Sequence, residues 1–455
     1  MKNELLAIAK RSEEIFDDFS KEDAISEISV DEIRKQLVKY DFNEPKPLGE
    51  IIDDVQFALG KWNLQTNHPL HFGLFQPSIT SSGVVADALV ALYNPQMATW
   101  WFSPAANEIE RHTLSFLKLK FGYDPDTTFA SFTSGGSESN YTAVITALTH
   151  RFPEYRENGA HALEKQPIIY ASQDAHDSMI RVAHQTGLGR NAVVRIPVDS
   201  ERKMDMQKLK VQLQADKLQG REPFMIVATV GTTSYGIIDP VEEIIELNKT
   251  ENLWLHVDAA WGGGFVISDE AKSYLKGIEQ ADSITWDPHK TLPIPTGAGF
   301  FLTKHREVMK QTFSVNASYV PDEIEGSVDS YKVSFSWSRR FTGLKIFMLL
   351  AESGSENLSK LLTHQVQMGN HFRKLLVDNG WTIVGSSPLP VICFTHSDHE
   401  QNIEKILQAV LDRKKVWLSK VDFNGQSVLR VCISSFKTEI SHLEILMDEL
   451  KTVMK

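Results

Sequence analysis

The sequence predicts an α/β protein with a mostly parallel central sheet and a smaller α+β region at its C-terminal end. In the middle of the 455-residue chain, short apolar β runs alternate with helical patterns such as that of residues 242–248. Strands that alternate with helices are typical of parallel sheets, whose ligands bind at the carboxyl ends of the strands. The predicted strands are residues 168–171, 192–196, 225–230, 253–257, 283–286 and 299–302.

The chain before these strands is expected to be helical and amphipathic from Met1 to about Asn67. Apolar residues recur there at helical spacing in two groups, Leu5, Ile8 and Ala9, and then Val30, Ile33, Leu37 and Val38. Such a segment cannot form a core by itself. We therefore expect it to pack on a larger surface, such as a second subunit.

The last hundred or so residues change in character. Strand patterns at residues 381–384, 391–394 and 428–433 are interleaved with helical patterns near residues 404–413 and 441–454. We therefore expect three regions along the chain, which are an N-terminal helical dimerisation segment (1–75), a large α/β domain (76–345) and a small domain (346–455).

The composition excludes several classes of protein. Hydrophobic residues make up 42% of the chain and charged residues 23%, as in folded globular proteins. The net charge of −12 disfavours binding to nucleic acids and to anionic membranes, and no apolar run is long enough to span a bilayer. Two cysteines, Cys393 and Cys432, exclude a disulfide scaffold and argue against a thiolate metal site. The short, charge-broken apolar stretch at the N-terminus is not typical of a signal peptide, so we expect a cytoplasmic protein without a metal.

The segment Thr133–Asn140 places small residues in front of a helical run at residues 141–150. Backbone N–H groups and the helix dipole at such a helix start attract a bound anion, and Ser137 adds a hydroxyl donor. By itself, the segment is better explained by an ordinary capped helix start.

Three more candidate residues follow predicted strands. Asp258 would need a partner, because burying an unpaired carboxylate is costly. A protonated ring nitrogen would serve, although a strand-end Asp alone is more typical of a structural hydrogen bond or a metal ligand. Lys290 can act as an amine nucleophile in a dry site, although Asp-Pro-His-Lys alone is more typical of a surface turn. His176 can stack on a flat ring or be an ordinary loop histidine.

The four segments are more specific together than apart. They place an anion-binding helix start, an acid, a histidine and an amine at strand ends of one α/β region. Pyridoxal 5′-phosphate (PLP) requires these groups, for its phosphate, its pyridine nitrogen, its ring face and its aldehyde respectively.

The chain resembles the group II PLP-dependent decarboxylases, which are relatives of the aromatic-L-amino-acid and glutamate decarboxylases. The resemblance runs from about residue 68 to residue 341 and more weakly to the C-terminus. Its motifs are His68-Pro69, Ser103–Ala105, Gly135–Glu138, Ala175-His176, Ala228–Thr233, His256–Ala260, Asp287–Lys290 and Arg339–Phe341. It implies amino-acid decarboxylation, the aspartate-aminotransferase-like fold (fold type I) with a seven-stranded sheet, PLP binding in the large domain, and a homodimer with active sites at the subunit interface.

Residue by residue, the resemblance matches Lys290 to the lysine that binds PLP covalently, Asp258 to the partner of the pyridine nitrogen, and His176 to the stacking histidine. The other matched cofactor positions are Gly136, Ser137, Thr233, Ala260 and His289. Aromatic decarboxylases have Asn where this chain has Asp287. Because a carboxylate repels phosphate, a phosphate contact is not carried over to Asp287.

The family also suggests residues that meet the substrate. The expected substrate wall contains Phe75 and Gln76, with Ala98 on a second wall from the partner subunit, and Arg339 matches an arginine near the site. Phe75 favours an aromatic substrate, whereas Gln76 is closer to the pattern of decarboxylases that act on acidic amino acids. An aromatic substrate is the preferred interpretation, and an acidic or diamino acid is the alternative.

Tyr319 falls on the loop tyrosine that protonates Cα in the family, and the polar loop at residues 314–326 suits a lid. A packed loop aromatic is the structural alternative. Aldehyde synthases carry Phe at this position, so Tyr319 favours decarboxylation. A sphingosine-phosphate-lyase-like carbon–carbon lyase is the nearest rival, but there Tyr-Gly follows the lysine, whereas Thr291-Leu292 follow it here. A non-catalytic scaffold would be expected to lack Lys290 or Asp258.

Overall fold

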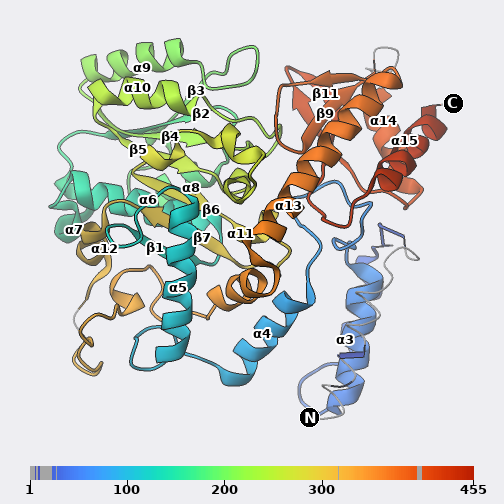
Figure 1. The fold of residues 1–455 in the computed structure, drawn as a ribbon, viewed down its shortest axis with the longest axis horizontal. Helices are drawn as coiled ribbons and strands as arrows, with labels where there is room; N and C mark the ends of the chain where they lie inside the picture. The colour runs from blue at the N-terminus through green and yellow to red at the C-terminus, as the bar shows by residue number, and fades with distance from the viewer. Residues whose placement is uncertain are drawn as a thin grey trace.

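The structure, a computed structural model, describes residues 6, 9–10, 23–26, 28–315, 317–396 and 402–454. Two sheets organise it (Figure 1), and their strand orders are β1-β7-β6-β5-β4-β2-β3 and β10-β11-β9-β8. The strands of the large sheet are β1 (Phe129–Thr133), β2 (Pro167–Ser172), β3 (Val193–Ile196), β4 (Glu222–Thr229), β5 (Trp254–Asp258), β6 (Ser283–Trp286) and β7 (Gly299–Thr303). Those of the small sheet are β8 (Thr382–Val384), β9 (Val391–Thr395), β10 (Ser419–Phe423) and β11 (Gln426–Cys432).

The helices fall into three groups along the chain. Before the large sheet lie α2 (Val30–Leu37), α3 (Leu48–Trp62), α4 (Ser81–Tyr93) and α5 (Pro104–Lys120). Between its strands lie α6 (Gly136–Arg151), α7 (Tyr155–Asn158), α8 (Ser178–Gln185), α9 (Met206–Leu218), α10 (Val241–Glu251) and α11 (Pro288–Thr291), with short 3-10 turns among them. After β7 follow α12 (Arg306–Phe313), α13 (Gly343–Asp378), α14 (Ile403–Asp412) and α15 (Ile440–Met454).

The large sheet is mostly parallel, as the sequence predicts. β2 pairs in parallel with β3 and β4, β4 with β5, and β5 with β6, whereas β7 runs antiparallel to β6 and β1. Each of the six predicted strands is present with bounds that differ by a few residues at most. The carboxyl ends of β4, β5 and β6 therefore meet at one edge of the sheet.

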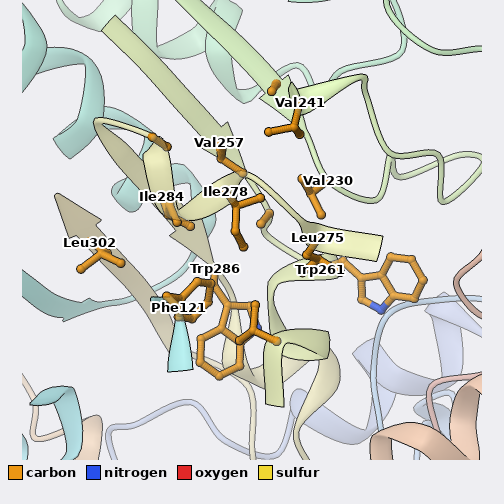
Figure 2. Close-up of a cluster of buried hydrophobic side chains, with 14 of the residues drawn as sticks. Phe121, Val230, Val241, Val257, Trp261, Leu275, Ile278, Ile284, Trp286 and Leu302 are labelled. Carbon is orange, nitrogen blue, oxygen red and sulfur yellow. The ribbon is translucent and has the colours of Figure 1, made fainter. Parts of the chain in front are cut away.

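Both faces of the large sheet are buried, which explains its continuous apolar strands. Along β2, Ile168 and Tyr170 belong to one hydrophobic cluster and Ile169 and Ala171 to another, as the alternation of side chains in a strand requires. Figure 2 shows part of the first cluster, in which the labelled side chains are Phe121, Val230, Val241, Val257, Trp261, Leu275, Ile278, Ile284, Trp286 and Leu302.

The N-terminal prediction is confirmed in part. Helix α2 begins after Ser29, whose hydroxyl accepts a hydrogen bond from the Glu32 N–H at 3.3 Å. The expectation of helix up to Asn67 is wrong for residues 38–47, where Pro45 and Pro47 interrupt the pattern, and for the residues after α3. The pattern at Leu5 and Ile8 lies outside the described residues.

Helix α13 joins the two sheets, as Figure 1 shows. It contacts α4 and α5 beside the large sheet, and β8, β9 and α15 in the small one. It is interrupted at Gly354, where φ is 70° and ψ is 159°, a conformation open to glycine but not to residues with a Cβ. Because α13 begins at Gly343, it crosses the expected boundary at 345/346, and both domain boundaries stay predictions. Within the described ranges, we find no helix with the length and apolarity needed to cross a membrane.

Candidate active site

A cavity of about 320 Å³ lies at the carboxyl ends of β4, β5 and β6, next to the start of α6. It lies where a sheet of this topology is expected to bind a ligand. All the residues predicted to hold a cofactor line it: Gly136, Ser137, His176, Thr233, Asp258, Ala260, His289 and Lys290. The structure therefore brings together groups that are more than 150 positions apart in the sequence.

The start of α6 forms one wall of the cavity. Strand β1 ends at Thr133, and the helix begins at Gly136 after a short turn. The first N–H groups of a helix have no partner within it, so those of Gly136 and Ser137 are available to an anion. A Cβ atom on Gly136 would lie 2.9 Å from Asp287 Oδ2 and 3.4 Å from Ala260 Cβ, so only glycine allows the helix to approach these residues so closely.

Asp258 is the last residue of β5 and is 4% exposed. Its Oδ2 accepts a hydrogen bond from Asn140 Nδ2 at 2.9 Å, and its Oδ1 accepts one from the Ala260 N–H at 3.2 Å. No cation forms an ion pair with Asp258 among the residues that the structure describes. A buried carboxylate in this state is suited to a cationic ring nitrogen, which supplies the missing charge.

Asn140 and His256 support Asp258 from behind. Asn140 Oδ1 is 3.0 Å from His256 Nε2, and Ser283 Oγ is 2.8 Å from His256 Nδ1. Complete burial lowers the pKa of His256, although the nearby carboxylate of Asp258 raises it. A neutral His256 leaves the negative charge of Asp258 uncancelled on the side away from the cavity.

Lys290 lies in the short helix α11 after β6, and its side chain is 28% exposed. Its Nζ is 2.8 Å from Asp287 Oδ2. The neighbouring His289 has its Nδ1 2.7 Å from the Ala298 carbonyl oxygen. Burial lowers the pKa of His289, and the Asp287 carboxylate opposes this shift. Lys290 thus lines the cavity from the short helix that follows β6.

His176 is exposed to the cavity, and its Nδ1 accepts a hydrogen bond from the Ser178 N–H at 3.1 Å. The preceding loop is held in place by Arg202, which forms an ion pair of 2.6 Å with Asp174. Both partners of this ion pair are 8% exposed, so the loop is fixed although His176 itself is accessible.

The residues present fit PLP. The unpaired N–H groups of α6 suit the phosphate, the buried Asp258 suits the pyridine nitrogen, His176 can cover the ring, and Lys290 can reach the aldehyde. Asp287 departs from this pattern, because it adds a second buried carboxylate beside the start of α6, where the phosphate would bind.

The predicted substrate residues are placed less uniformly. Phe75 lines the cavity, whereas Gln76, Ala98, Arg339 and Tyr319 are not among the residues that line it in this chain. Ala98 is 1% exposed.

Arg339 and Tyr319 are held elsewhere. Arg339 donates to both carboxylate oxygens of Glu110, at 3.0 and 2.6 Å, so contact with a substrate would require this buried ion pair to break. Tyr319 is 77% exposed, with its ring centroid 6.2 Å from that of Trp337.

Sequence reasoning assigned no role to several residues that line the cavity, among them Asn140 and Trp261. Asn140 follows Gly136 by four positions and therefore lies on the same face of α6, a spacing that could have identified it. Trp261 follows the Asp-Ala-Ala motif, and its ring stacks on Phe75 with centroids 4.6 Å apart. Its apolar character gave no signal that separates it from the core.

Comparisons with known proteins agree with this geometry. Residues 32–397 match the family described as pyridoxal-dependent decarboxylase conserved domain. The chain is 28% identical over 401 residues to an aromatic-L-amino-acid decarboxylase of Bacillus atrophaeus, covering 85% of this chain and 81% of that relative. It is 29% identical over 332 residues to an L-aspartate decarboxylase of Metarhizium robertsii, covering 71% of this chain and 66% of that relative. The solved structure of Catharanthus roseus tryptophan decarboxylase in complex with L-tryptophan matches this chain with a TM-score of 0.91 at 22% identity, covering 99% of this chain and 97% of that one. This match confirms the predicted fold class.

Proposed function

Because this chain belongs to the pyridoxal-dependent decarboxylase family, and is therefore a PLP-dependent amino-acid decarboxylase, we propose that its substrate is an L-amino acid with an aromatic side chain. The products are the corresponding amine and carbon dioxide. The observation that carries the proposal is the aromatic wall that Phe75 and Trp261 form beside Lys290 in the cavity.

The wall is suited to a flat apolar side chain. The rings of Phe75 and Trp261 are stacked with an interplanar angle of 23°, and the guanidinium of Arg430 lies 5.0 Å from the Phe75 ring centroid. Aromatic rings pack favourably against such surfaces in offset-stacked or edge-to-face arrangements. An aromatic substrate would therefore gain contact area without leaving a charge unpaired.

An acidic substrate would need a cation for its side-chain carboxylate. Among the described residues that line the cavity, the basic ones are His176, His289 and Lys290. The fit with PLP uses His176 and Lys290, and His289 Nδ1 lies 2.7 Å from the Ala298 carbonyl oxygen. The nearby Arg430 is occupied, because it donates to the carbonyl oxygens of Thr233 and Ser234 at 2.9 and 3.1 Å. An acidic substrate remains the second candidate, favoured by Gln76 and by the similarity to an L-aspartate decarboxylase.

A substrate panel tests the proposal. We expect the PLP-loaded enzyme to release carbon dioxide from tryptophan, tyrosine or phenylalanine with a kcat/KM at least about tenfold higher than from aspartate, glutamate or 2,4-diaminobutyrate, a difference of the size that one well-matched apolar contact provides. Amine formation should match carbon dioxide release. Phe75→Ala should reduce this preference, whereas a preference for aspartate or glutamate in the unmodified enzyme would contradict the proposal.

The proposed roles of the residues follow from their places in the cavity. When bound, PLP supplies an electron sink for the charge left as the substrate carboxylate departs. The N–H groups at the start of α6 hold the phosphate, and Asp258 keeps a proton on the ring nitrogen. His176 would cover the ring, and Lys290 would supply the amine that holds the aldehyde.

The role of Asp258 is testable by Asp258→Asn. We expect kcat to fall by about a hundredfold or more, because loss of a buried charge partner costs roughly 3–5 kcal/mol where it is felt in the transition state. Steady-state kinetics on the PLP-loaded variant measure the effect. Asp282→Asn is a matched control, because Asp282 precedes β6 at the opposite edge of the sheet, where it pairs with Lys304. The control should lose stability but little kcat, and a near-normal kcat for Asp258→Asn would remove the proposed role.

We also propose that the enzyme is a homodimer with its active sites at the subunit interface. Helix α3 leaves Val55, Phe57 and Leu59 48–55% exposed in the single chain. Helices α4 and α5 border an apolar hollow of about 690 Å³ that contains Tyr93 and Phe102, both more than half exposed. A second copy would bury these surfaces. The cytoplasmic location expected from the sequence stays a prediction.

A further inference from the structure

The carboxylate of Asp287 is buried beside the start of α6. The residue is 2% exposed, and its Oδ2 lies 2.9 Å from the point that a Cβ of Gly136 would occupy. Its Oδ1 has no hydrogen-bond partner although it is fully buried. A negative group thus lies against the first turn of α6, where the phosphate of PLP is expected to bind.

In the free protein, Lys290 balances this charge. The ion pair between Lys290 Nζ and Asp287 Oδ2 measures 2.8 Å, and no other cation pairs with Asp287 within the described parts of the chain. PLP engages this same amine. An amine engaged with the cofactor would no longer be a free ammonium group for Asp287, while the phosphate would lie next to the same carboxylate. Two like charges at close range in a buried site strongly favour the uptake of a proton by one of them.

We propose that Asp287 makes cofactor binding proton-linked. In the loaded enzyme, one proton taken from solvent lies between the Asp287 carboxyl group and a phosphate oxygen, where it turns a repulsive contact into a hydrogen bond. This inference rests on the proposed roles of Lys290 and the start of α6. The affinity of the enzyme for PLP therefore falls as the pH rises, because binding requires a proton and the concentration of protons is lower.

The effect of Asp287 on the pH dependence of PLP binding must be distinguished from the effects of other titratable groups nearby. His289 and Lys290 follow Asp287 in α11, Asp258 faces the cavity from β5, Glu138 from α6, and His176 from the loop before α8. All of them remain when Asp287 alone is changed.

The experiment compares the dissociation constant of PLP in wild-type enzyme and Asp287→Asn from about pH 6 to pH 8.5, a range over which a phosphate monoester passes from partly protonated to dianionic. Asn has the same shape but no charge. We expect wild-type enzyme and Asp287→Asn to bind PLP with similar affinity near pH 6. Near pH 8, we expect Asp287→Asn to bind PLP at least about tenfold more tightly than wild type, because protonation that would remove the repulsion between the carboxylate and the phosphate is then unfavourable. A ratio of dissociation constants that does not change with pH, or weaker binding by the variant throughout, would overturn the inference.

Glu138→Gln is the matched control for loss of a negative charge in the same cavity. Glu138 already accepts hydrogen bonds from the Ser134 N–H and hydroxyl, at 2.9 and 2.6 Å. Its replacement should leave the pH dependence of PLP binding as in wild type. If Glu138→Gln flattens that dependence as fully as Asp287→Asn does, the effect does not belong to Asp287.

A second measurement needs no variant of Asp287. The Lys290→Ala variant leaves the Asp287 carboxylate without its cation. We therefore expect the affinity of this variant for pyridoxine 5′-phosphate, which lacks the aldehyde, to fall as the pH rises above the second pKa of the phosphate. The fall should be up to about tenfold per pH unit. The affinity of the variant for pyridoxine, which lacks the phosphate, should stay nearly constant. A flat profile for both ligands would overturn the inference. Failure of the wild-type protein to bind PLP at all would instead contradict the proposed function.

Discussion

Replacing Lys290 with alanine is expected to abolish turnover and the yellow absorbance of lysine-bound PLP. Lys290 lies in α11, just after β6, and it is the one lysine among the described residues that line this cavity. No neighbour can therefore form the covalent bond to the cofactor in its place. We expect activity to fall by more than about a thousandfold, since both capture of the cofactor and its transfer to the substrate are lost.

Lys290→Arg separates the nucleophile from the charge. Arginine keeps a positive charge next to Asp287, so the fold and thermal stability should stay close to those of wild type. Its guanidinium remains protonated in proteins and does not act as an amine nucleophile, so this variant should be as inactive as Lys290→Ala. Absorbance spectra, product assays and melting curves on the same preparations decide the question. Substantial activity in either variant would show that the covalent link is made elsewhere.

The fold could be predicted from the sequence where burial leaves a strong pattern. Strand β5 is buried at every position, so its apolar run was recognised. Strand β1 has the sequence Phe-Ala-Ser-Phe-Thr, whose small and polar residues hid a strand that is buried at four of five positions. Strand β10 lies at the edge of the small sheet and alternates between partly buried and exposed residues, so it carries little hydrophobic signal.

The residues predicted to hold the cofactor line one cavity because the topology of the sheet brings them together. Strand ends that are distant in sequence meet at one edge, so Asp258 and Lys290 share a cavity with the start of α6. The residues expected at the substrate could not be placed in the same way. Ala98 is expected on a wall from the partner subunit and Tyr319 on a lid loop, and the packing of one chain brings neither to its own cavity.

Sequence also could not reveal how charges are distributed within the site. The motif Asp287-Pro-His-Lys290 indicates a reactive lysine, but not that the two charged side chains pair at 2.8 Å. It also does not indicate that the second carboxylate oxygen of Asp287 is buried without a partner. These features depend on how closely α6 approaches the end of β6, which Gly136 permits. They determine the pH at which the cofactor binds well, rather than whether it binds.

Replacing Tyr319 with phenylalanine is expected to change the product rather than cofactor binding. The ring that lies near Trp337 is kept and only the hydroxyl is lost, so folding and PLP absorbance should be unaffected. If the hydroxyl delivers the proton to Cα, its loss should lower amine formation by about a hundredfold to ten-thousandfold, as is usual for a general acid. Carbon dioxide should still be released, and under air the substrate should yield aldehyde, ammonia and hydrogen peroxide, with one oxygen molecule and one water consumed for each turnover. An unchanged amine yield would exclude Tyr319 as the donor.

Mixing two inactive variants tests whether Tyr319 acts in the partner subunit. In a dimer of one Lys290→Ala chain and one Tyr319→Phe chain, the site that retains Lys290 can obtain Tyr319 only from the other chain. If the loop acts across the interface, refolding an equal mixture should restore amine formation to about a quarter of the wild-type value, because half of the dimers are mixed and each has one complete site. If the loop serves its own chain, or if the enzyme is a monomer, the mixture should form no more amine than the separate variants. The exposed position of Tyr319, outside the cavity of its own chain, leads us to expect recovery.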